Sequence, residues 1–575
     1  MCDRSWVVSE TSAISALADA APEATQTGAV PVGSTLNSLL VGNWHHELFE
    51  RLRWEELMYG CAVFLALSTV AWLLVTEFAR RSGFPLSRRL RIGVSAGLLL
   101  ISFGVYFSFL NPNVRHKDYF HPDQVYHHYL GAKYFTELGY SHIYTCTAVA
   151  ESELHGSDSV AHKKFRELQH GNIVRRIEHT NNLSEPDRCK QHFSDERWRA
   201  FKKDLEYIKS ASPEDDWDRM KQGHGYSASP VWTMTGRWLA QQGIVSIETF
   251  QQLAAIDVGL QLGAFALLVW AFGWEIAAAT AVFWGTSGVA NFSWTGGAFL
   301  SQDGFFLLVA SLCLAKKRRY TLSGAALTWS ALLRLFPAIS LIAVIGLTAV
   351  HYLQHRRIAT SHRRFLLGAV LATALLVPAS IAATGANAYP AYLQHLQTQR
   401  AAPTLNQMGL EVALAHSWSS RLRFTQDDTL PDPLEDWGAT HTTNARTLLP
   451  LQLLLSLAIV AGLLAYFRRG PPLWVVLPLS LPLIFSVTNM ACYSYVGLLL
   501  LVPLMRLNRA LAIPSLLAAA ASQVLLSQFY WLDDRYAALS YLYLAVTLMP
   551  LAVLLRPERL LGRLAWTWSK RFARR

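Results

Sequence analysis

The chain has 575 residues, of which 52% are hydrophobic and only 16% are charged, whereas an average soluble domain has about 25% charged residues. The formal net charge is +11. The apolar residues form blocks of roughly 15 to 22 residues with almost no internal charge, which is the length that crosses a hydrocarbon core about 30 Å thick. This composition excludes a soluble, disordered or disulfide-rich secreted protein and predicts an all-α polytopic membrane protein.

In chain order, a polar N-terminal segment (1–57) precedes two spans (58–110), a first outer, periplasmic loop (111–250) and a transmembrane core (251–384). A second outer loop (385–446), C-terminal spans (447–555) and a basic cytoplasmic tail (556–575) follow. Apolar blocks predict about 13 transmembrane segments, at 58–78, 92–110, 252–272, 275–292, 300–315, 321–334, 336–353, 365–384, 447–466, 472–487, 491–506, 510–528 and 538–555.

The positive charge is concentrated at the ends of these blocks, as in loops that remain in the cytoplasm. DNA binding would require a continuous basic face with no bilayer in the way, so no nucleic-acid partner is expected. The basic clusters are Arg80, Arg81, Arg88, Arg89 and Arg91; Lys316 to Arg319; Arg356, Arg357, Arg363 and Arg364; Arg468 and Arg469; and Arg506 and Arg509.

All these basic clusters fall on the same side of the membrane only if segment 321–353 is a hairpin of two short membrane segments. Pro337 lacks a backbone donor and disfavours helical geometry at the residue before it, so we expect a break at Leu335-Phe336-Pro337. The two long loops then share the outer side, and the C-terminus is cytoplasmic. Cys146 and Cys189 both lie in the first outer loop, where they either form a disulfide or remain two free thiols.

The first outer loop starts with an unusual density of histidine, aspartate and tyrosine close to the membrane. Three interpretations are open: an interfacial helix with an aromatic belt, a metal site of His121, Asp123, His127 and His128, or a general base that takes a proton from an acceptor hydroxyl. The candidate base is Asp118 or Asp123. The residues concerned are Asp118, His121, Asp123, Tyr126, His127 and His128.

Two further ionisable residues stand at the ends of apolar segments. Asp303 begins a span after a glycine pair, and an ionisable group near membrane depth indicates a functional site unless it is a solvated loop residue. Arg334 lies at the apex of the hairpin without basic neighbours. Its fork of donors could hold a phosphate, or its side chain could simply reach the interface.

The remaining candidates lie in the outer loops. His224 and Tyr226, close to the return into the membrane, would line an acceptor cleft or serve a structural role. An acidic patch in the second loop could chelate a divalent cation, the one cofactor we consider, but its prolines also fit an exposed loop. The patch comprises Asp427, Asp428, Asp432, Glu435 and Asp436.

Three features of this layout resemble membrane glycosyltransferases of the GT-C superfamily. The first is the acidic first outer loop, where Asp118 and Asp123 are followed by a tyrosine- and glycine-rich stretch. The second is a segment in which an acidic residue is followed by an apolar span, a basic turn, a glycine and an arginine that precedes a proline. The third is the later large outer loop, 385–446. The phrases 129–140 and 223–232 also resemble uncharacterised bacterial multi-span proteins. The matching positions of the second feature are Asp303, Lys316 to Arg319, Gly324, Arg334 and Pro337.

The resemblance covers most of residues 90–510 in layout and implies a GT-C-like bundle. Such enzymes usually transfer a sugar from a polyprenyl-phosphate donor at the outer leaflet. Carried over, Asp118 or Asp123 would be the base, Asp303 a second acidic site residue, and Arg334 the phosphate contact. The chain departs from the family in two respects. Its acidic loop follows the second span, so 58–78 would be an extra span, and Arg334 stands where lysine is common, which changes the donor geometry.

We therefore expect an enzyme of the bacterial cytoplasmic (inner) membrane that serves glycan biosynthesis in the cell envelope. It would move a monosaccharide from a polyprenyl-phosphate donor to a hydroxyl of a lipid or glycan acceptor. Such a donor already carries a leaving group, which agrees with the lack of a glycine-rich nucleotide motif in the sequence. The alternative is a transporter or flippase for a lipid-linked or anionic substrate. Transporters place polar groups at the midplane between related halves, whereas these candidates gather at the outer surface.

Overall fold

The computed structural model describes residues 35–111, 117–169 and 172–556. In this part of the chain, eight helices are long and apolar enough to cross a membrane, which confirms an all-α, multi-pass membrane protein. The number of 13 segments stays a prediction, because the other expected spans form shorter helices. The eight helical segments are Trp54–Arg81, Arg88–Tyr106, Ile247–Phe272, Pro337–His355, Thr360–Thr384, Glu435–Phe467, Arg509–Gln528 and Leu532–Leu555.

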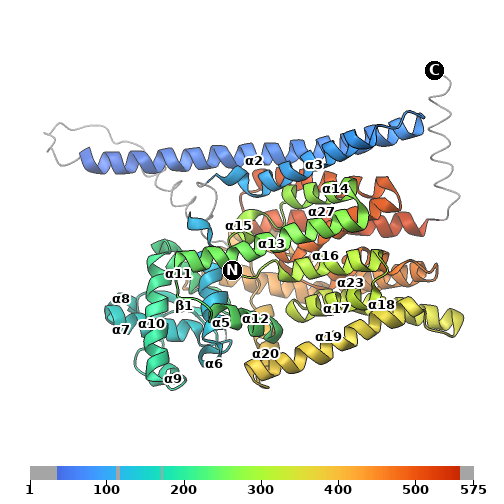
Figure 1. Cartoon of the computed structure of the whole chain (residues 1–575). Coiled ribbons are helices and arrows are strands. Elements are labelled where there is room, and N and C mark those ends of the chain that lie inside the picture. Colours follow the sequence, from blue (N-terminus) through green and yellow to red (C-terminus); the bar gives the residue numbers. More distant parts are fainter. Residues whose placement is uncertain (1–34, 112–116, 170–171, 557–575) are drawn as a thin grey trace.

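The membrane bundle consists of roughly parallel helices, with α2 and α3 along one edge and α19 along the opposite edge (Figure 1). The boundary expected at residue 57 lies inside α2, and the tail beyond residue 556 lies outside the described residues. The elements are α2 (Thr35–Arg81), α3 (Arg88–Tyr106), η1 (Ser108–Leu110), α13 (Ile247–Phe272), α14 (Trp274–Thr286), α15 (Phe292–Thr295), α16 (Asp303–Lys316), α17 (Tyr320–Leu333), α18 (Pro337–His355), α19 (Thr360–Thr384), α23 (Glu435–Phe467), α24 (Leu473–Leu479), α25 (Leu481–Val487), β4 (Met490–Ala491), η6 (Cys492–Arg506), η7 (Arg509–Leu511), α26 (Ile513–Gln528) and α27 (Leu532–Leu555).

The first long loop folds into a domain of its own, which we call the loop domain, at one end of the bundle (Figure 1). Two short strands, β1 and β2, pair in antiparallel register with Lys164 opposite Arg176. The elements are η2 (Lys117–Tyr119), α4 (Pro122–Gln124), η3 (Val125–Leu130), α5 (Gly131–Lys133), α6 (Phe135–Leu138), α7 (Ile143–His155), α8 (Asp158–Ala161), β1 (Lys164–Glu167), β2 (Ile173–Arg176), η4 (Ile177–His179), α9 (Asp187–Lys190), α10 (Asp195–Ser210), α11 (Glu214–Met220) and α12 (Pro230–Ala240).

The second long loop connects α19 to α23 and lies against the bundle. Its strand β3 pairs in antiparallel register with β4, with Gln407 opposite Ala491, so the loop is tied to the turn that precedes η6. The elements are α20 (Ala388–Arg400), β3 (Gln407–Met408), α21 (Leu410–Ala415), η5 (Trp418–Ser420) and α22 (Leu422–Thr425).

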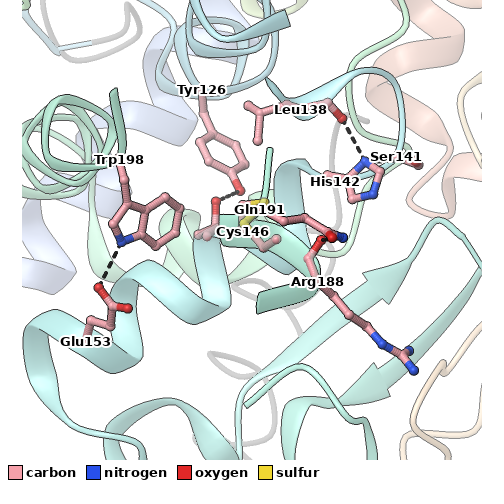
Figure 2. Close-up of a disulfide and its surroundings, with 11 residues drawn as sticks. Tyr126, Leu138, Ser141, His142, Cys146, Glu153, Arg188, Gln191 and Trp198 are labelled. Carbon is pink, nitrogen blue, oxygen red and sulfur yellow. Dashed lines mark hydrogen bonds between the residues drawn. A yellow bond between two sulfur atoms is a disulfide. The ribbon is translucent and has the colours of Figure 1, made fainter. Parts of the chain in front are cut away.

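A disulfide and a buried ion pair hold the loop domain together. Cys146 of α7 and Cys189 of α9 form the disulfide, and both are buried (Figure 2). Deeper in the same domain, Lys221 Nζ lies 2.9 Å from Glu151 Oε2, and each side chain is only 1% exposed. Trp217 Nε1 donates to the other carboxylate oxygen at 2.8 Å. The charged pair is therefore fully enclosed, with both carboxylate oxygens bonded.

The hydrophobic core of the loop domain is separate from that of the bundle, but it extends onto bundle residues such as Leu300 and Leu333. Trp232 of α12 packs among loop residues, and its Nε1 donates to the backbone oxygen of Leu300 in the bundle at 2.9 Å. His121 N donates to Gly297 O at 2.8 Å, next to the start of α16. Gly297 has a φ of +66°, and a Cβ there would lie 3.1 Å from the Phe120 Cα, so glycine is what lets the two backbones approach. These contacts fix the position of the loop domain relative to the bundle.

Candidate functional site

Close to its start, the loop domain contains a π-helix, the wider helical form that is frequent at functional sites. Pro122 provides the first helical residue of α4, where its missing donor is tolerated, and η3 continues from Val125 to Leu130 as the π-helix. Its six residues include His127 and His128, and these two sequence neighbours make contact with different groups.

His127 connects Asp123 to the interior of the loop domain. Its Nδ1 lies 2.8 Å from the Asp123 backbone oxygen and 3.4 Å from Asp123 Oδ1. Its Nε2 lies 2.9 Å from the Tyr144 hydroxyl, which accepts a bond from Gly225 N. A carbonyl oxygen only accepts, so His127 Nδ1 donates to it. Both ring nitrogens are occupied, and His127 therefore positions Asp123.

The Asp123 carboxylate is held in its charged form. Burial by itself raises its pKa, but the charge and hydrogen bond of His127 outweigh this effect and lower the pKa to about 2. Its side chain is 18% exposed. The neighbouring His121 is buried, and burial lowers the pKa of its imidazole although Asp123 opposes this shift. The loop side of the site thus presents a carboxylate that is ionised at neutral pH.

On the bundle side, the site contains Asp303 and Arg334. Asp303 is the first residue of α16, and its Oδ1 accepts from Gly304 N at 2.6 Å. Arg334 directly follows the end of α17, where the chain breaks before α18, and its Nη2 lies 3.9 Å from Asp303 Oδ1. The Arg334 side chain is 32% exposed. Its guanidinium is therefore only loosely paired and keeps donors available for an anion.

A third carboxylate, Asp257 of α13, supports this arrangement. It is 4% exposed and accepts from the backbone nitrogens of Ser301 at 2.9 Å and Gln302 at 3.1 Å. These two bonds fix the segment immediately before Asp303. Sequence reasoning missed Asp257, although an acidic residue inside an apolar block is the signal that could have identified it.

His128 lies where the loop side and the bundle side meet. Its Nδ1 is buried and has no hydrogen-bond partner in the described part of the chain, and its ring packs against Trp232 and Tyr226 at centroid distances of 5.5 and 6.2 Å. Burial and, to a smaller extent, the charge of Arg334 lower the pKa of His128 to about 3, while Asp123 opposes the shift. His128 is therefore neutral at pH 7, and the charges of both Arg334 and Asp123 influence its pKa.

Two tyrosines complete the surroundings of Arg334. Burial raises the pKa of Tyr392, on α20, to about 12, and it raises the pKa of Tyr226 well above its ordinary value. The charge of Arg334 opposes both shifts. Both phenols are therefore neutral at pH 7. Tyr392 is another site residue that sequence reasoning did not select, because only the folded chain brings it here.

The other predicted site residues make contacts outside this group. Asp118 is exposed, and its backbone oxygen accepts from Gln251 at 2.7 Å. The buried Tyr126 bonds through its hydroxyl to Thr147 at 2.8 Å, inside the loop domain. His224 O accepts from Gln399 of α20 at 3.3 Å, where the two long loops meet.

Neither metal site considered from the sequence has converging ligand atoms. The side chains of His121, Asp123, His127 and His128 are described, but they do not form such a group. In the acidic patch, Asp427 accepts from Thr429 and Asp432 faces Arg166 at 3.5 Å. Within the described residues, the group with metal-binding geometry is a different one, consisting of His416, Asp533 and Asp534.

Comparison with protein-family models, curated proteins and solved structures finds no match to this chain. The functional argument therefore rests on the chemistry of the site. An ionised carboxylate, a neutral imidazole with a free nitrogen and a partly exposed guanidinium surround one region at the junction of the loop domain and the bundle. Such a set can accept a proton from a hydroxyl and stabilise negative charge on a phosphate.

Proposed function

We propose that this protein is a membrane glycosyltransferase of the GT-C type that transfers a monosaccharide from a polyprenyl-phosphate donor to an acceptor hydroxyl. The observation that carries this proposal is that Asp123, on the loop side, and Arg334, on the bundle side, both act electrostatically on the half-buried ring of His128. The Asp123 carboxylate can accept the proton of the acceptor hydroxyl, and the Arg334 guanidinium can stabilise the leaving phosphate.

In the proposed reaction, the acceptor oxygen attacks the anomeric carbon of the donor and forms the new glycosidic bond. The bond between this carbon and the phosphate oxygen breaks, and its electron pair leaves with the phosphate. The acceptor proton passes to the Asp123 carboxylate, a step that typically contributes a factor of about 10²–10⁴ in rate. Arg334 stabilises the charge that develops on the phosphate.

The surroundings of Arg334 also suit a lipid-linked donor. Leu335, the next residue, is 50% exposed, and Trp329 in the last turns of α17 is 40% exposed. A phosphate bound to Arg334 would therefore have apolar surface beside it for its polyprenyl chain. A soluble nucleotide sugar would gain nothing from this surface, which favours the lipid donor.

The experiment compares cells that carry wild type, Asp123→Asn, Asp118→Asn and Arg334→Gln, each shown to be stably inserted, with a deletion strain. The readout is the intact mass of extracted lipids and surface glycans. We expect Asp123→Asn and Arg334→Gln to reproduce the loss of one sugar increment seen in the deletion strain. Asp118→Asn is the matched control and should retain the increment, because Asp118 is exposed and outside the site.

Two outcomes would contradict the proposal. Loss of the increment in Asp118→Asn alone would move the base to the other aspartate. Unchanged glycans in all variants, together with a lipid-linked precursor that accumulates only in the deletion strain, would instead favour the transporter or flippase.

A further inference from the structure

A second polar cluster lies apart from the proposed site, where the second long loop contacts α27. It consists of His416, which follows α21, and of Asp533 and Asp534 in the first turn of α27. One ligand atom of each residue lies within 4.8 Å of the others. His416 Nε2 and Asp534 Oδ1 are already 3.1 Å apart. Ligand atoms on a tetrahedral ion at 2.0–2.1 Å are about 3.3 Å apart, so this pair needs almost no movement to bind one.

A small cavity adjoins this cluster. Its volume is about 10 Å³, enough for one water-sized group, and its walls include His416, Asp533, Gln407 and His441. Asp533 is 4% exposed and its Oδ1 has no hydrogen-bond partner among the described residues. Gln407 Oε1 is likewise buried without a partner there. Unpartnered oxygens that border a cavity of this size indicate a missing ligand, because leaving them unbonded costs free energy.

The charges of the cluster are only partly compensated. Arg421 Nε lies 3.3 Å from Asp534 Oδ1, and its guanidinium rests 4.2 Å from the centre of the Trp418 ring. Asp533 accepts from Leu422 N at 2.7 Å and has no basic side chain within 4.0 Å in the described part of the chain. The cluster thus holds two carboxylates and one guanidinium, and a cation would balance the second carboxylate.

We infer that His416, Asp533 and Asp534 bind one divalent transition-metal ion of the zinc class, beside the cavity that His441 also lines. Imidazole together with carboxylate suits zinc, whereas magnesium and calcium prefer oxygen ligands alone. The ion would connect residues of the second long loop to the first turn of α27. Its role is structural and does not depend on the proposed glycosyl transfer.

The test uses the full-length protein, purified in detergent without a histidine tag, incubated with ZnCl₂ and then washed. Elemental analysis should find about one zinc per chain for wild type and a small fraction of this for Asp533→Asn and His416→Gln. The matched control is His362→Gln, because His362 is also buried but lies on α19, outside the cluster. It should retain the zinc.

A second measurement needs no variant. Chelator treatment should lower the Tm of wild type by at least about 2 °C, and ZnCl₂, but not MgCl₂, should restore it. Wild type that retains no zinc would overturn the inference and leave the cluster as an ion-pair network. Zinc that persists in Asp533→Asn and His416→Gln would also overturn it.

Discussion

The loop domain and the membrane bundle are stabilised by different interactions. The loop domain encloses charge: Lys221 and Glu151 are buried together, and a disulfide joins α7 to α9. The bundle relies on close backbone contact, as between α17 and α19, where a Cβ added at Gly324 or Gly368 would lie within 2 Å of a backbone oxygen of the other helix. Without a hydrophobic difference between lipid and side chain, such packing is what holds membrane helices together.

In the bundle, the positions of two carboxylates indicate where the site lies. Asp257 and Asp303 are carboxylates in the bundle, and both lie at the end that contacts the loop domain, near Arg334. In the loop domain, by contrast, the buried pair of Lys221 and Glu151 has no part in the proposed site.

The largest effect is expected for the buried ion pair. Lys221→Met leaves the Glu151 carboxylate buried without its main partner and should lower the free energy of unfolding by about 3–5 kcal/mol. Burial raises the pKa of Glu151, but Lys221, together with Trp217 and Lys209, more than offsets this, so the folded pKa is lowered. The pair therefore stabilises the wild type above the ordinary carboxyl pKa, and this stabilisation is lost as the pH falls.

Denaturant unfolding followed by tryptophan fluorescence, at neutral and acid pH, measures the effect. Lys202→Met is the control, because Lys202 makes a partly exposed ion pair with Glu153 and should cost less than about 1 kcal/mol. Equal losses of unfolding free energy in the two variants would show that burial does not make the Lys221 pair more stabilising than the Lys202 pair.

A smaller loss of stability is expected when the close contact between α17 and α19 is disturbed. In Gly368→Ala the new Cβ would lie 1.8 Å from the Thr321 backbone oxygen, so α17 and α19 must separate. Overpacking of this kind typically costs about 1–3 kcal/mol. Gly346→Ala is the control, because its nearest neighbour would be an ordinary 3.8 Å from the new Cβ. The Tm of the detergent-solubilised protein should fall for Gly368→Ala only. A similar fall in both would mean that helix propensity, and not close contact, governs the bundle.

The smallest effect concerns the junction and rests on the proposed function. His127→Phe removes the group that lowers the pKa of Asp123, while the burial that raises it remains. The acid limb of kcat/KM should therefore move to higher pH, because the active carboxylate would become protonated sooner. The pH profile of sugar transfer measures this shift, and His142→Phe, elsewhere in the loop domain, should leave it unchanged. An unmoved limb would remove Asp123 from the role of base.

Local sequence signals predicted much of the bundle but less of the site. Apolar blocks indicated the long helices because their length matches the bilayer, and Pro337 indicated the start of α18 because proline restricts the backbone directly. Asp303 and Arg334 could be selected because charge stands out in apolar surroundings. The proximity of His128 to Arg334 could not be predicted from the sequence, because it depends on contacts between distant segments, such as that of Trp232 with Leu300. The π-helix has no marker in its residues.

The π-helix also makes the site unusually sensitive to length. Successive residues of an α-helix are rotated by about 100°, so deletion of one residue from 125–130 would tighten this turn and turn every side chain before it relative to those after it. Asp123 and His128 would then face different directions although no residue of the site had been substituted. Among natural variants of this sequence, substitutions in this turn should therefore be tolerated more often than insertions or deletions.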